Sequence, residues 1–340
     1  MTYESLGIIG AGSWGTALAL LLAEKGYSFP LWVYEEDLCA SMIKKRENTL
    51  FLPGFPLHQN IHPTASLKEA VADKSILLLV VPTHVMRQTI KNIKPYLKPG
   101  CLLINASKGI ENETLCTIHQ ILEQELDVPH TSAAISGPTF AKEIAQGLPS
   151  ALVAAADTME TAERVREIFS TPKMKVFTST DPLGVEIGGA LKNVIAIATG
   201  ICDGMQLGYN PRAALITRGL VEITRIGTAQ GARPETFSGL SGMGDLVLTC
   251  TGDLSRNRNV GIQLGQGKKL SEITKNMKMV AEGIFTVKSA FALKNKFKIQ
   301  AAIIEETYRV IYEDKSPHKA LEDLMSVEID TEFSGVRGLE

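Results

Sequence analysis

The sequence lacks the features that mark several broad classes of protein. Its formal net charge is −2, and it holds no long run of like charge, whereas proteins that bind nucleic acid or anionic membranes usually carry a basic face. Its beginning, MTYESLGIIGAG, has neither the basic nor the apolar region of a secretory signal peptide. The most apolar stretches are too short to span a bilayer or carry Glu186 and Lys192. We therefore expect a cytoplasmic protein that binds no nucleic acid and does not insert stably into membranes.

Short, repeated cysteine spacings are also absent. His58 and His62 have the spacing of metal ligands on a helix, but the three prolines of LPGFPLHQNIHP disfavour a helix there. We therefore expect no metal site. Disulfide frameworks and metal motifs need closer pairing than the five cysteines offer, so we expect reduced thiols at Cys39, Cys101, Cys116, Cys202 and Cys250.

Short apolar runs alternate with helical patterns in the first half of the chain. Continuous apolar runs such as SILLLVVP are typical of buried parallel strands. Strand alternating with helix predicts a parallel, doubly wound α/β sheet. The runs that we expect to form strands are 6–9, 28–37, 75–82, 101–109, 132–138 and 150–156.

The pattern changes after about residue 180, where helical spacing dominates and convincing strands disappear. A chain of 340 residues with 44% hydrophobic side chains is long enough for two cores. We predict an α/β domain over 1–184, an all-helical domain over 185–332, and a loose tail over 333–340.

Gly10, Gly12 and Gly15 form a G-x-G-x-x-G motif between a predicted strand and a predicted helix. The first glycine permits a tight turn, the second lets the backbone approach a pyrophosphate, and the third brings the helix close to the sheet. Amides at the helix start then face the phosphates. Because strand, helix and following strand are all present, we expect a Rossmann domain that binds a dinucleotide.

Glu35 lies 25 residues after Gly10 (35 − 10), just past the second predicted strand. An acid there can accept hydrogen bonds from the adenosine ribose of NAD and repel the extra phosphate of NADP. The alternative is that Glu35, Glu36 and Asp37 merely favour a helix start. We expect NAD or NADP as cofactor, with NAD slightly favoured.

Three other predicted strands end in loops that contain Pro82, Lys108, and the pair Gly137 and Thr139. Ligands of open parallel sheets bind beyond the carboxyl ends of the strands, so these loops are expected around one crevice. Lys108 would place a positive charge on an anionic substrate, although a loop lysine in water is the alternative.

The stretch SGLSGMGDLVLTCTGDLSRNRNVG, residues 238–261, sets Asp245 among glycines that allow tight packing. Ser255, Arg256 and Asn257 begin another predicted helix. A guanidinium with hydroxyl, amide and backbone donors is suited to a phosphate. The alternative is a capped surface helix with two exposed arginines.

Lys192 lies in the apolar helical stretch GGALKNVIAIATG, where no residue three or four positions away can neutralise it. Burial lowers the pKa of an amine, which would allow proton exchange near neutrality in a dehydrogenase. The alternative is a lysine whose stem lies on apolar surface while its tip reaches water.

Seven motifs together resemble the NAD(P)-dependent glycerol-3-phosphate dehydrogenase family and run in family order from residue 10 to about 286. The resemblance implies a Rossmann domain, a helical domain and an active site between them. It also implies reversible reduction of dihydroxyacetone phosphate to sn-glycerol 3-phosphate for glycerophospholipid synthesis. The motifs are GAGSWGTALA, ENTLFLPG, ASKGIE, SGPTFAKE, GGALKNVIAIATG, SGMGDLVLTCTGDLSRNR and VAEGIFT.

The resemblance also implies roles for individual residues. Lys192 would be the proton donor and acceptor, supported by Lys108 and Asp245. Tyr34 stands where bacterial relatives often carry a basic residue, which puts a preference for NADP in doubt. The other substrate-binding residues would be Gly137, Thr139, Ser255, Arg256 and Asn257. The cofactor-binding residues would be Gly10, Gly12, Ser13, Trp14, Gly15, Tyr34, Glu35, Pro82, Lys108, Ala141, Arg256, Val280 and Glu282.

Two other functions share part of this pattern. A hydroxy-acid or ketopantoate reductase type of enzyme has the glycine loop and a helical lysine, but not the arrangement of Ser255, Arg256 and Asn257. A catalytically idle nucleotide sensor would retain the glycine loop, but it would not need Lys192. An all-helical second domain offers apolar faces for a homodimer.

Overall fold

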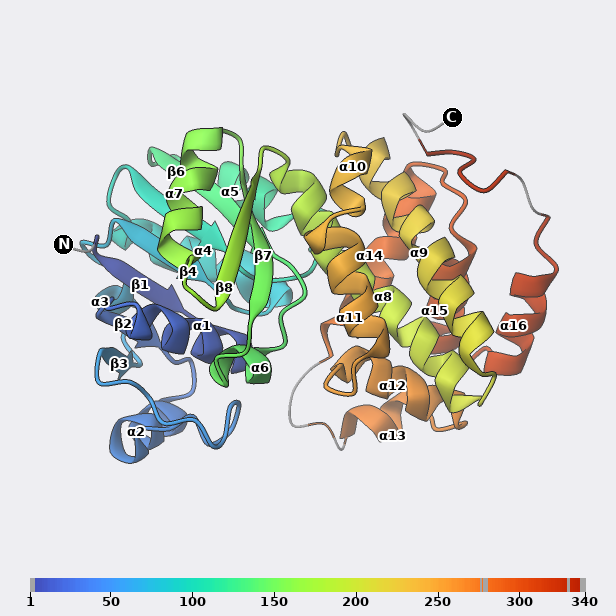
Figure 1. Ribbon diagram of the computed structural model, residues 1–340, viewed down its shortest axis with the longest axis horizontal. Coiled ribbons are helices and arrows are strands. Elements are labelled where there is room, and N and C mark those ends of the chain that lie inside the picture. The colour runs from blue at the N-terminus through green and yellow to red at the C-terminus, as the bar shows by residue number, and fades with distance from the viewer. Residues whose placement is uncertain (1–3, 276, 278–280, 329–330, 337–340) are drawn as a thin grey trace. The chain divides into compact units, whose positions relative to one another are not determined.

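The computed structural model describes residues 4–275, 277, 281–328 and 331–336 and forms two compact units (Figure 1). The first unit comprises Met1–Ser107 and Ile118–Pro182, and the second comprises Lys108–Thr117 and Leu183–Glu340. The division at Pro182 lies two residues before the predicted one at 184. Residues 108–117, predicted within the first domain, belong to the second unit, because Ile110 and Leu115 pack in its hydrophobic core.

The first unit is built on an eight-stranded sheet in the order β3-β2-β1-β4-β5-β6-β7-β8, which confirms the doubly wound α/β prediction. Every neighbouring pair is parallel except β6 and β7, which are antiparallel, so the sheet is mostly parallel. The strands are β1 (Leu6–Ile9), β2 (Phe29–Trp32), β3 (Ile61–Thr64), β4 (Ile76–Leu79), β5 (Cys101–Asn105), β6 (His130–Ser136), β7 (Ser150–Ala156) and β8 (Met174–Ser179).

The two strands that the sequence did not predict, β3 and β8, are the edges of the sheet. β3 contains Pro63, and β8 alternates buried Met174 and Val176 with exposed Lys175 and Phe177. Neither has the continuous apolar run of a central parallel strand, because an edge strand need not be covered on both sides.

Helices cover both faces of the sheet in the first unit, with α1 and α7 on one face and α4 and α5 on the other (Figure 1). α1 is almost wholly buried, and the chain leaves it at Gly26, whose φ of +106° favours glycine. The helices of this unit are α1 (Ser13–Glu24), α2 (Glu36–Lys45), α3 (Leu67–Val71), α4 (Thr83–Ile93), a 3₁₀ turn (Lys94–Tyr96), α5 (Ile118–Glu125), α6 (Ala141–Ala145) and α7 (Met159–Phe169).

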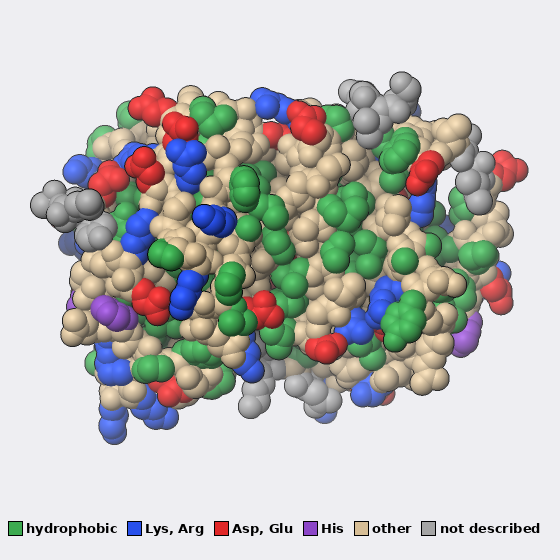
Figure 2. Space-filling view, in the orientation of Figure 1, with side chains coloured by type: hydrophobic (Ala, Val, Ile, Leu, Met, Phe, Trp, Pro, Cys, Tyr) green, Lys and Arg blue, Asp and Glu red, His purple; other side chains and the backbone are tan. Residues whose placement is uncertain are grey.

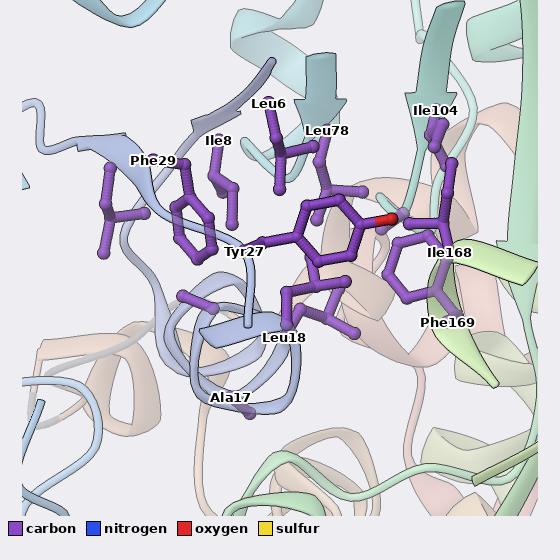
Figure 3. Close-up of a cluster of buried hydrophobic side chains, with 14 of the residues drawn as sticks. Leu6, Ile8, Ala17, Leu18, Tyr27, Phe29, Leu78, Ile104, Ile168 and Phe169 are labelled. Atoms are coloured by element: carbon purple, nitrogen blue, oxygen red, sulfur yellow. The ribbon is translucent and has the colours of Figure 1, made fainter. Parts of the chain in front are cut away.

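The core of this unit forms where α1 and α7 pack against the sheet (Figure 3). Leu18 of α1 and Phe169 of α7 lie with Ile8 of β1, and all three side chains are fully buried. Burying such side chains stabilises the fold by roughly 1.5–3 kcal/mol each. This packing fixes where β1 ends and α1 begins, which is where the glycine loop lies.

The second unit is all-helical in its described residues, as predicted. Its core includes side chains from α8, α9, α12, α14 and α15. The helices are α8 (Pro182–Gly204), α9 (Tyr209–Ala229), α10 (Pro234–Phe237), a π-helical turn (Leu240–Gly244), α11 (Asp245–Thr251), α12 (Arg256–Gly265), α13 (Leu270–Lys275), α14 (Glu282–Lys296), α15 (Ala302–Tyr312) and α16 (Pro317–Met325).

α8 is the core helix of the second unit. By length and composition alone it could cross a membrane, but its apolar window is entirely buried inside the protein, as in the core helix of a globular fold. Glycines let it touch α12 at backbone level: a Cβ at Gly200 would lie 2.1 Å from the Arg258 carbonyl oxygen, and one at Gly261 would lie 2.1 Å from that of Ile197. This contact fixes the distance between α8 and α12.

The described part of the predicted loose tail is bound to α9. Arg225 Nε donates to the Ser334 carbonyl at 2.6 Å, and Arg218 donates to the Glu332 carbonyl at 2.5 Å. Val336 is buried. Residues 331–336 are therefore anchored, while 337–340 lie outside the described residues.

Figure 2 shows lysine and arginine side chains interspersed with acidic ones on the visible face. The described residues on that face form no large area of one charge, which agrees with the net charge of −2.

Candidate active site

Lys192 lies in the middle of α8, and its partners come from another helix. Its Nζ lies 2.5 Å from Asp245 Oδ1 and donates to Thr249 Oγ1 at 2.8 Å, both on α11. The Lys192 side chain is only 8% exposed. The ammonium is thus buried and paired, rather than extended into water.

Asp245 holds two lysines at once. Lys192 binds its Oδ1, and Lys108 Nζ lies 2.6 Å from its Oδ2. The Asp245 side chain is 1% exposed and that of Lys108 is 16% exposed. Two ammonium groups face one carboxylate here, so this group of three carries an excess of one positive charge.

The glycine-rich segment before α11 brings this carboxylate to α8. A Cβ at Gly242 would lie 2.0 Å from the Phe237 carbonyl oxygen, so the turn has no room for a side chain there. A Cβ at Gly188 of α8 would lie 2.8 Å from the Ser241 carbonyl oxygen. Asp245 and Thr249 are four residues apart on α11 and share one face. The close approach and the shared face together place both side chains at Lys192.

The surroundings of Lys192 set its protonation. Burial lowers the pKa of Lys192 from its ordinary 10.5 to about 8, because an ammonium loses hydration when it is enclosed. The carboxylate of Asp245 opposes this shift, and the positive charge of Lys108 adds to it. The amine can therefore gain and lose a proton near neutral pH.

The segment predicted to bind phosphate starts α12. Ser255 is the N-cap, and its Oγ accepts a hydrogen bond from the Arg258 backbone N–H at 3.2 Å. Arg256 is exposed, whereas Arg258 is held by Asp203 at 2.8 Å and its side chain is 11% exposed. The predicted alternative of a capped helix with two exposed arginines thus holds for the cap and for Arg256, but not for Arg258.

Asn257 is buried and links three helices. Its Nδ2 donates to Asn193 Oδ1 on α8 at 2.9 Å, and its Oδ1 accepts from the backbone N–H of Gly283 on α14 at 2.9 Å. Arg256 keeps part of its surface exposed, yet desolvation lowers the pKa of its guanidinium, and the charge of Glu282, at the start of α14, opposes that lowering.

The glycine loop of the first unit has the geometry that a dinucleotide needs. Gly10 has a φ of +117°, which favours glycine. A Cβ at Gly15 would lie 2.0 Å from the Gly10 carbonyl oxygen, so the third glycine lets α1 pack against the turn. A Cβ at Gly12 would meet nothing within 4 Å, which leaves this backbone open to a close ligand. These features fit the pyrophosphate of NAD or NADP.

Ser13 and Trp14 begin α1 and are half-buried. Ser13 Oγ donates to the Phe51 carbonyl at 2.6 Å, and Trp14 Nε1 donates to the Ala106 carbonyl at 3.1 Å. Each side chain thus ties the start of α1 to a neighbouring segment.

Tyr34 and Glu35 follow β2 and are exposed, and Tyr34 packs edge-on against Trp32. Glu35 is the N-cap residue of α2, but its side chain makes no capping hydrogen bond. The alternative role of Glu35 as a helix start is thus met by its position and not by its carboxylate.

The other predicted residues of the first unit follow β4 and β6. Pro82 is the exposed N-cap residue of α4, and Ala141 is the first residue of α6. Gly137 is buried, and a Cβ there would lie 2.8 Å from Leu152 Cα. Thr139 Oγ1 donates to the Gly137 carbonyl at 3.0 Å. Val280 lies outside the described residues.

Sequence reasoning missed three residues that support these groups. Thr249 was signalled by its spacing of four from Asp245, and Asn193 by its position beside Lys192. Asn48, in the ENTLFLPG motif, is fully buried and donates to the Ala11 carbonyl in the glycine loop at 2.8 Å. No local pattern pairs Asn48 with Ala11, which lies 37 positions away.

Both units match the two halves of one known family. Residues 5–162 match the N-terminal domain of NAD-dependent glycerol-3-phosphate dehydrogenase, and residues 181–322 match its C-terminal domain. A glycerol-3-phosphate dehydrogenase [NAD(P)+] of Geobacter metallireducens is 54% identical over 325 residues, which cover 95% of this chain and 97% of the relative. The enzyme of the same description from Geobacter sulfurreducens is 51% identical over 331 residues, with 97% and 99% covered.

The fold is also similar to a solved structure. The crystal structure of glycerol-3-phosphate dehydrogenase from Coxiella burnetii matches with a TM-score of 0.92 and 36% identity, and the match covers 95% of this chain and 99% of that one.

Proposed function

The chain belongs to the NAD-dependent glycerol-3-phosphate dehydrogenase family, and from this premise we propose that Lys192 exchanges the proton in the reversible reduction of dihydroxyacetone phosphate to sn-glycerol 3-phosphate. The observation that carries the proposal is the buried contact of Lys192 with Asp245 and Thr249. Lys192 is also the one residue that was predicted from the sequence to supply this proton.

Lys192 acts as general acid in the direction of reduction. A bound NADH or NADPH supplies the hydride, and the ketone oxygen then needs a proton. An ammonium has three N–H groups, and in the described residues two of those of Lys192 point to Asp245 and Thr249. The third is directed to the substrate oxygen in this proposal. In the reverse direction the neutral amine takes the proton from the alcohol.

In this proposal Asp245 and Lys108 set the electrostatic environment of the substrate ketone oxygen. Asp245 orients the ammonium of Lys192, and its negative charge opposes the lowering of the Lys192 pKa by burial. Lys108 brings the excess positive charge of the group, which stabilises negative charge as it develops on the ketone oxygen. The arrangement therefore favours the transition state over a neutral ground state.

Arg256 is proposed to bind the substrate phosphate, with Ser255 and Asn257 beside it. Arg256 lies at the first turn of α12 and keeps part of its surface exposed, and backbone N–H groups and the helix dipole there also favour an anion. Asn257 holds the starts of α12 and α14 to α8. Gly137 and Thr139 are proposed as further substrate contacts from the first unit.

NAD or NADP is proposed to bind at the glycine loop, with NAD slightly favoured. The exposed carboxylate of Glu35 follows β2, where it would repel a 2′-phosphate. Tyr34 beside it brings no positive charge to attract that phosphate. Ser13, Trp14, Pro82, Lys108, Ala141, Arg256, Val280 and Glu282 complete the proposed cofactor contacts.

Three wider proposals follow from this role. The product supplies the backbone of glycerophospholipids. The protein acts in the cytoplasm, in keeping with an apolar α8 that is buried within its own fold. Exposed apolar side chains of the helical unit, including Phe285 and Met325, offer a surface for a homodimer, which sedimentation velocity would detect.

The direct test is the consumption of NADH with dihydroxyacetone phosphate, repeated with NADPH. We expect measurable turnover with both NADH and NADPH, and a higher kcat/KM with NADH. A higher kcat/KM with NADPH would overturn the cofactor preference. Turnover of carboxylate-bearing ketones in place of phosphorylated ones would overturn the substrate assignment.

A further inference from the structure

Asn48 is a fully buried polar residue that the proposed reaction does not use. Its Nδ2 donates to the Ala11 carbonyl and to Thr16 Oγ1, each at 2.8 Å. Its Oδ1 accepts from the Phe51 backbone N–H at 3.0 Å. Ala11 is the residue between the first two glycines of the loop, so Asn48 binds the glycine loop itself.

The hydrogen bond to Ala11 sets the direction of the next backbone amide. The Ala11 carbonyl and the Gly12 N–H belong to one peptide group, and in a trans peptide these two bonds point in opposite directions. Because Asn48 holds the carbonyl toward the protein interior, the Gly12 N–H is turned away from it. Gly12 is the N-cap residue of α1, and nothing lies within 4 Å of where its Cβ would be.

The segment that carries Asn48 is well anchored. Leu57 N–H donates to the Arg46 carbonyl at 2.7 Å, and the Arg46 guanidinium donates to the His58 carbonyl at 2.6 Å. Leu52 is buried. Ser13 Oγ returns a hydrogen bond from α1 to the Phe51 carbonyl of the same segment. A fixed segment of this kind can hold a peptide plane steady.

We propose that Asn48 is a positioning residue for the cofactor pyrophosphate, because it aims the Gly12 N–H at a phosphate oxygen. The inference rests on the proposed binding of a dinucleotide at the glycine loop. An amide that is already oriented needs no rearrangement when the ligand arrives, and a pre-oriented donor binds an anion more tightly than a mobile one. Asn48 touches neither the phosphate nor the reacting atoms in this role.

The test separates this role from a general contribution to folding. Isothermal titration calorimetry would measure the binding of NADH and of ADP-ribose, both of which contain the pyrophosphate. A displacement titration would measure the binding of adenosine, which lacks it. For Asn48→Ala we expect NADH and ADP-ribose to bind on the order of tenfold more weakly. Adenosine should change by less than about twofold, because its contacts do not involve Gly12.

Thr16→Val is the matched control. It removes the other hydrogen bond of Asn48 Nδ2, and with it the longer bond of 3.4 Å from Thr16 Oγ1 to the Ala11 carbonyl, and it leaves the 2.8 Å bond from Asn48 to Ala11 in place. Its affinity for ADP-ribose should remain within about twofold of that of the unchanged protein. Equal weakening in Thr16→Val and Asn48→Ala, or equal weakening of ADP-ribose and adenosine, would overturn the inference.

Asn48→Ser provides a second variant if Asn48→Ala does not fold, since a serine hydroxyl is too short to reach the Ala11 carbonyl but leaves a smaller cavity. The same selective loss of ADP-ribose binding is expected. If the unchanged protein bound no NADH, the proposed function would fail. If it bound NADH and Asn48→Ser bound ADP-ribose equally well, the role of Asn48 alone would fail.

Discussion

Lys192 and Asp245 lie 53 positions apart in the sequence, and their Nζ and Oδ1 atoms lie 2.5 Å apart within the helical unit. The pair is almost completely buried, with side-chain exposures of 8% and 1%. A lysine paired with a single carboxylate would be neutralised, but here Lys108 occupies the other carboxylate oxygen. The shared carboxylate therefore orients Lys192 without removing the positive charge of the group.

Replacing Lys192 tests the central assignment. Lys192→Met keeps the apolar stem and removes the ammonium, so we expect kcat for dihydroxyacetone phosphate reduction to fall by roughly 10²- to 10⁴-fold. Affinity for NADH should change by less than about threefold, because Lys192 is not assigned to the cofactor. Steady-state kinetics and NADH titration would measure the two effects. Near-normal turnover in Lys192→Met and in Lys192→Ala would remove Lys192 from the reaction.

The pH dependence follows from the pKa of Lys192, which burial lowers to about 8. Reduction needs the protonated amine, so its kcat/KM should fall as pH rises through about 8. Oxidation of glycerol 3-phosphate needs the neutral amine, so its kcat/KM should rise over the same range. Asp245→Asn removes the main influence that raises this pKa, and both profiles should then move to lower pH.

Asp323→Asn is the control for this shift. It removes a carboxylate of α16 that pairs with Lys315 and Lys319 rather than with Lys192. Its pH profiles should coincide with those of the unchanged protein. Profiles of Asp245→Asn that also coincide with them would contradict the coupling between Asp245 and Lys192.

Local patterns predicted much of the fold. The spacing of Gly10, Gly12 and Gly15 between an apolar run and a helical pattern was enough to place the glycine loop. The tight turn and the close packing that need these glycines involve residues only a few positions apart. The edge strands β3 and β8 and the antiparallel pair β6 and β7 were not predicted. Strand order and direction depend on contacts between distant segments, so the local spacing of residues does not predict them.

The site shows the same division between local and distant information. The sequence placed Lys192 in a helix without a partner of its own, but nothing near it identified Asp245 as the counter-ion. Asn48 was visible within a motif, but its hydrogen bond to Ala11 arises from the path of the chain between them. Burial of Arg258 was unpredictable for the same reason, since Asp203 lies 55 positions away.

Replacing Arg256 tests phosphate recognition. A charged hydrogen bond contributes about 1.5–3 kcal/mol, so Arg256→Ala should lower kcat/KM for dihydroxyacetone phosphate by roughly ten- to a hundredfold. Arg256 is also a proposed cofactor contact, so both substrates are compared at saturating NADH, where the phosphate-free analogue dihydroxyacetone should be reduced at an almost unchanged kcat/KM. Arg256→Lys keeps the charge but loses the guanidinium fork, so its kcat/KM for dihydroxyacetone phosphate should lie between those of the unchanged protein and of Arg256→Ala. An equal loss on both substrates would argue against a phosphate contact.

Glu222 of α9 predicts a pH dependence of stability that is separate from catalysis. Its buried carboxylate accepts the Ile303 and Ile304 backbone N–H groups at 2.8 and 3.0 Å, so it caps the start of α15 from another helix. Burial raises the pKa of Glu222 from 4.5 to about 7, although these two hydrogen bonds and Arg225 oppose the rise. The folded protein therefore keeps this proton to a higher pH than the unfolded chain does.

The sign of the effect follows from proton binding. Between about pH 4.5 and 7 the folded state holds more protons at Glu222 than the unfolded state, so the free energy of unfolding should fall as pH rises through this range. The total change would be roughly 3 kcal/mol. Glu222→Gln cannot titrate there, so the difference between the two proteins in urea unfolding should change between pH 4.5 and 7 and stay constant above about 8. A difference that is constant across the whole range would show that the pKa of Glu222 is the same in the folded and the unfolded protein, and would contradict the raised pKa.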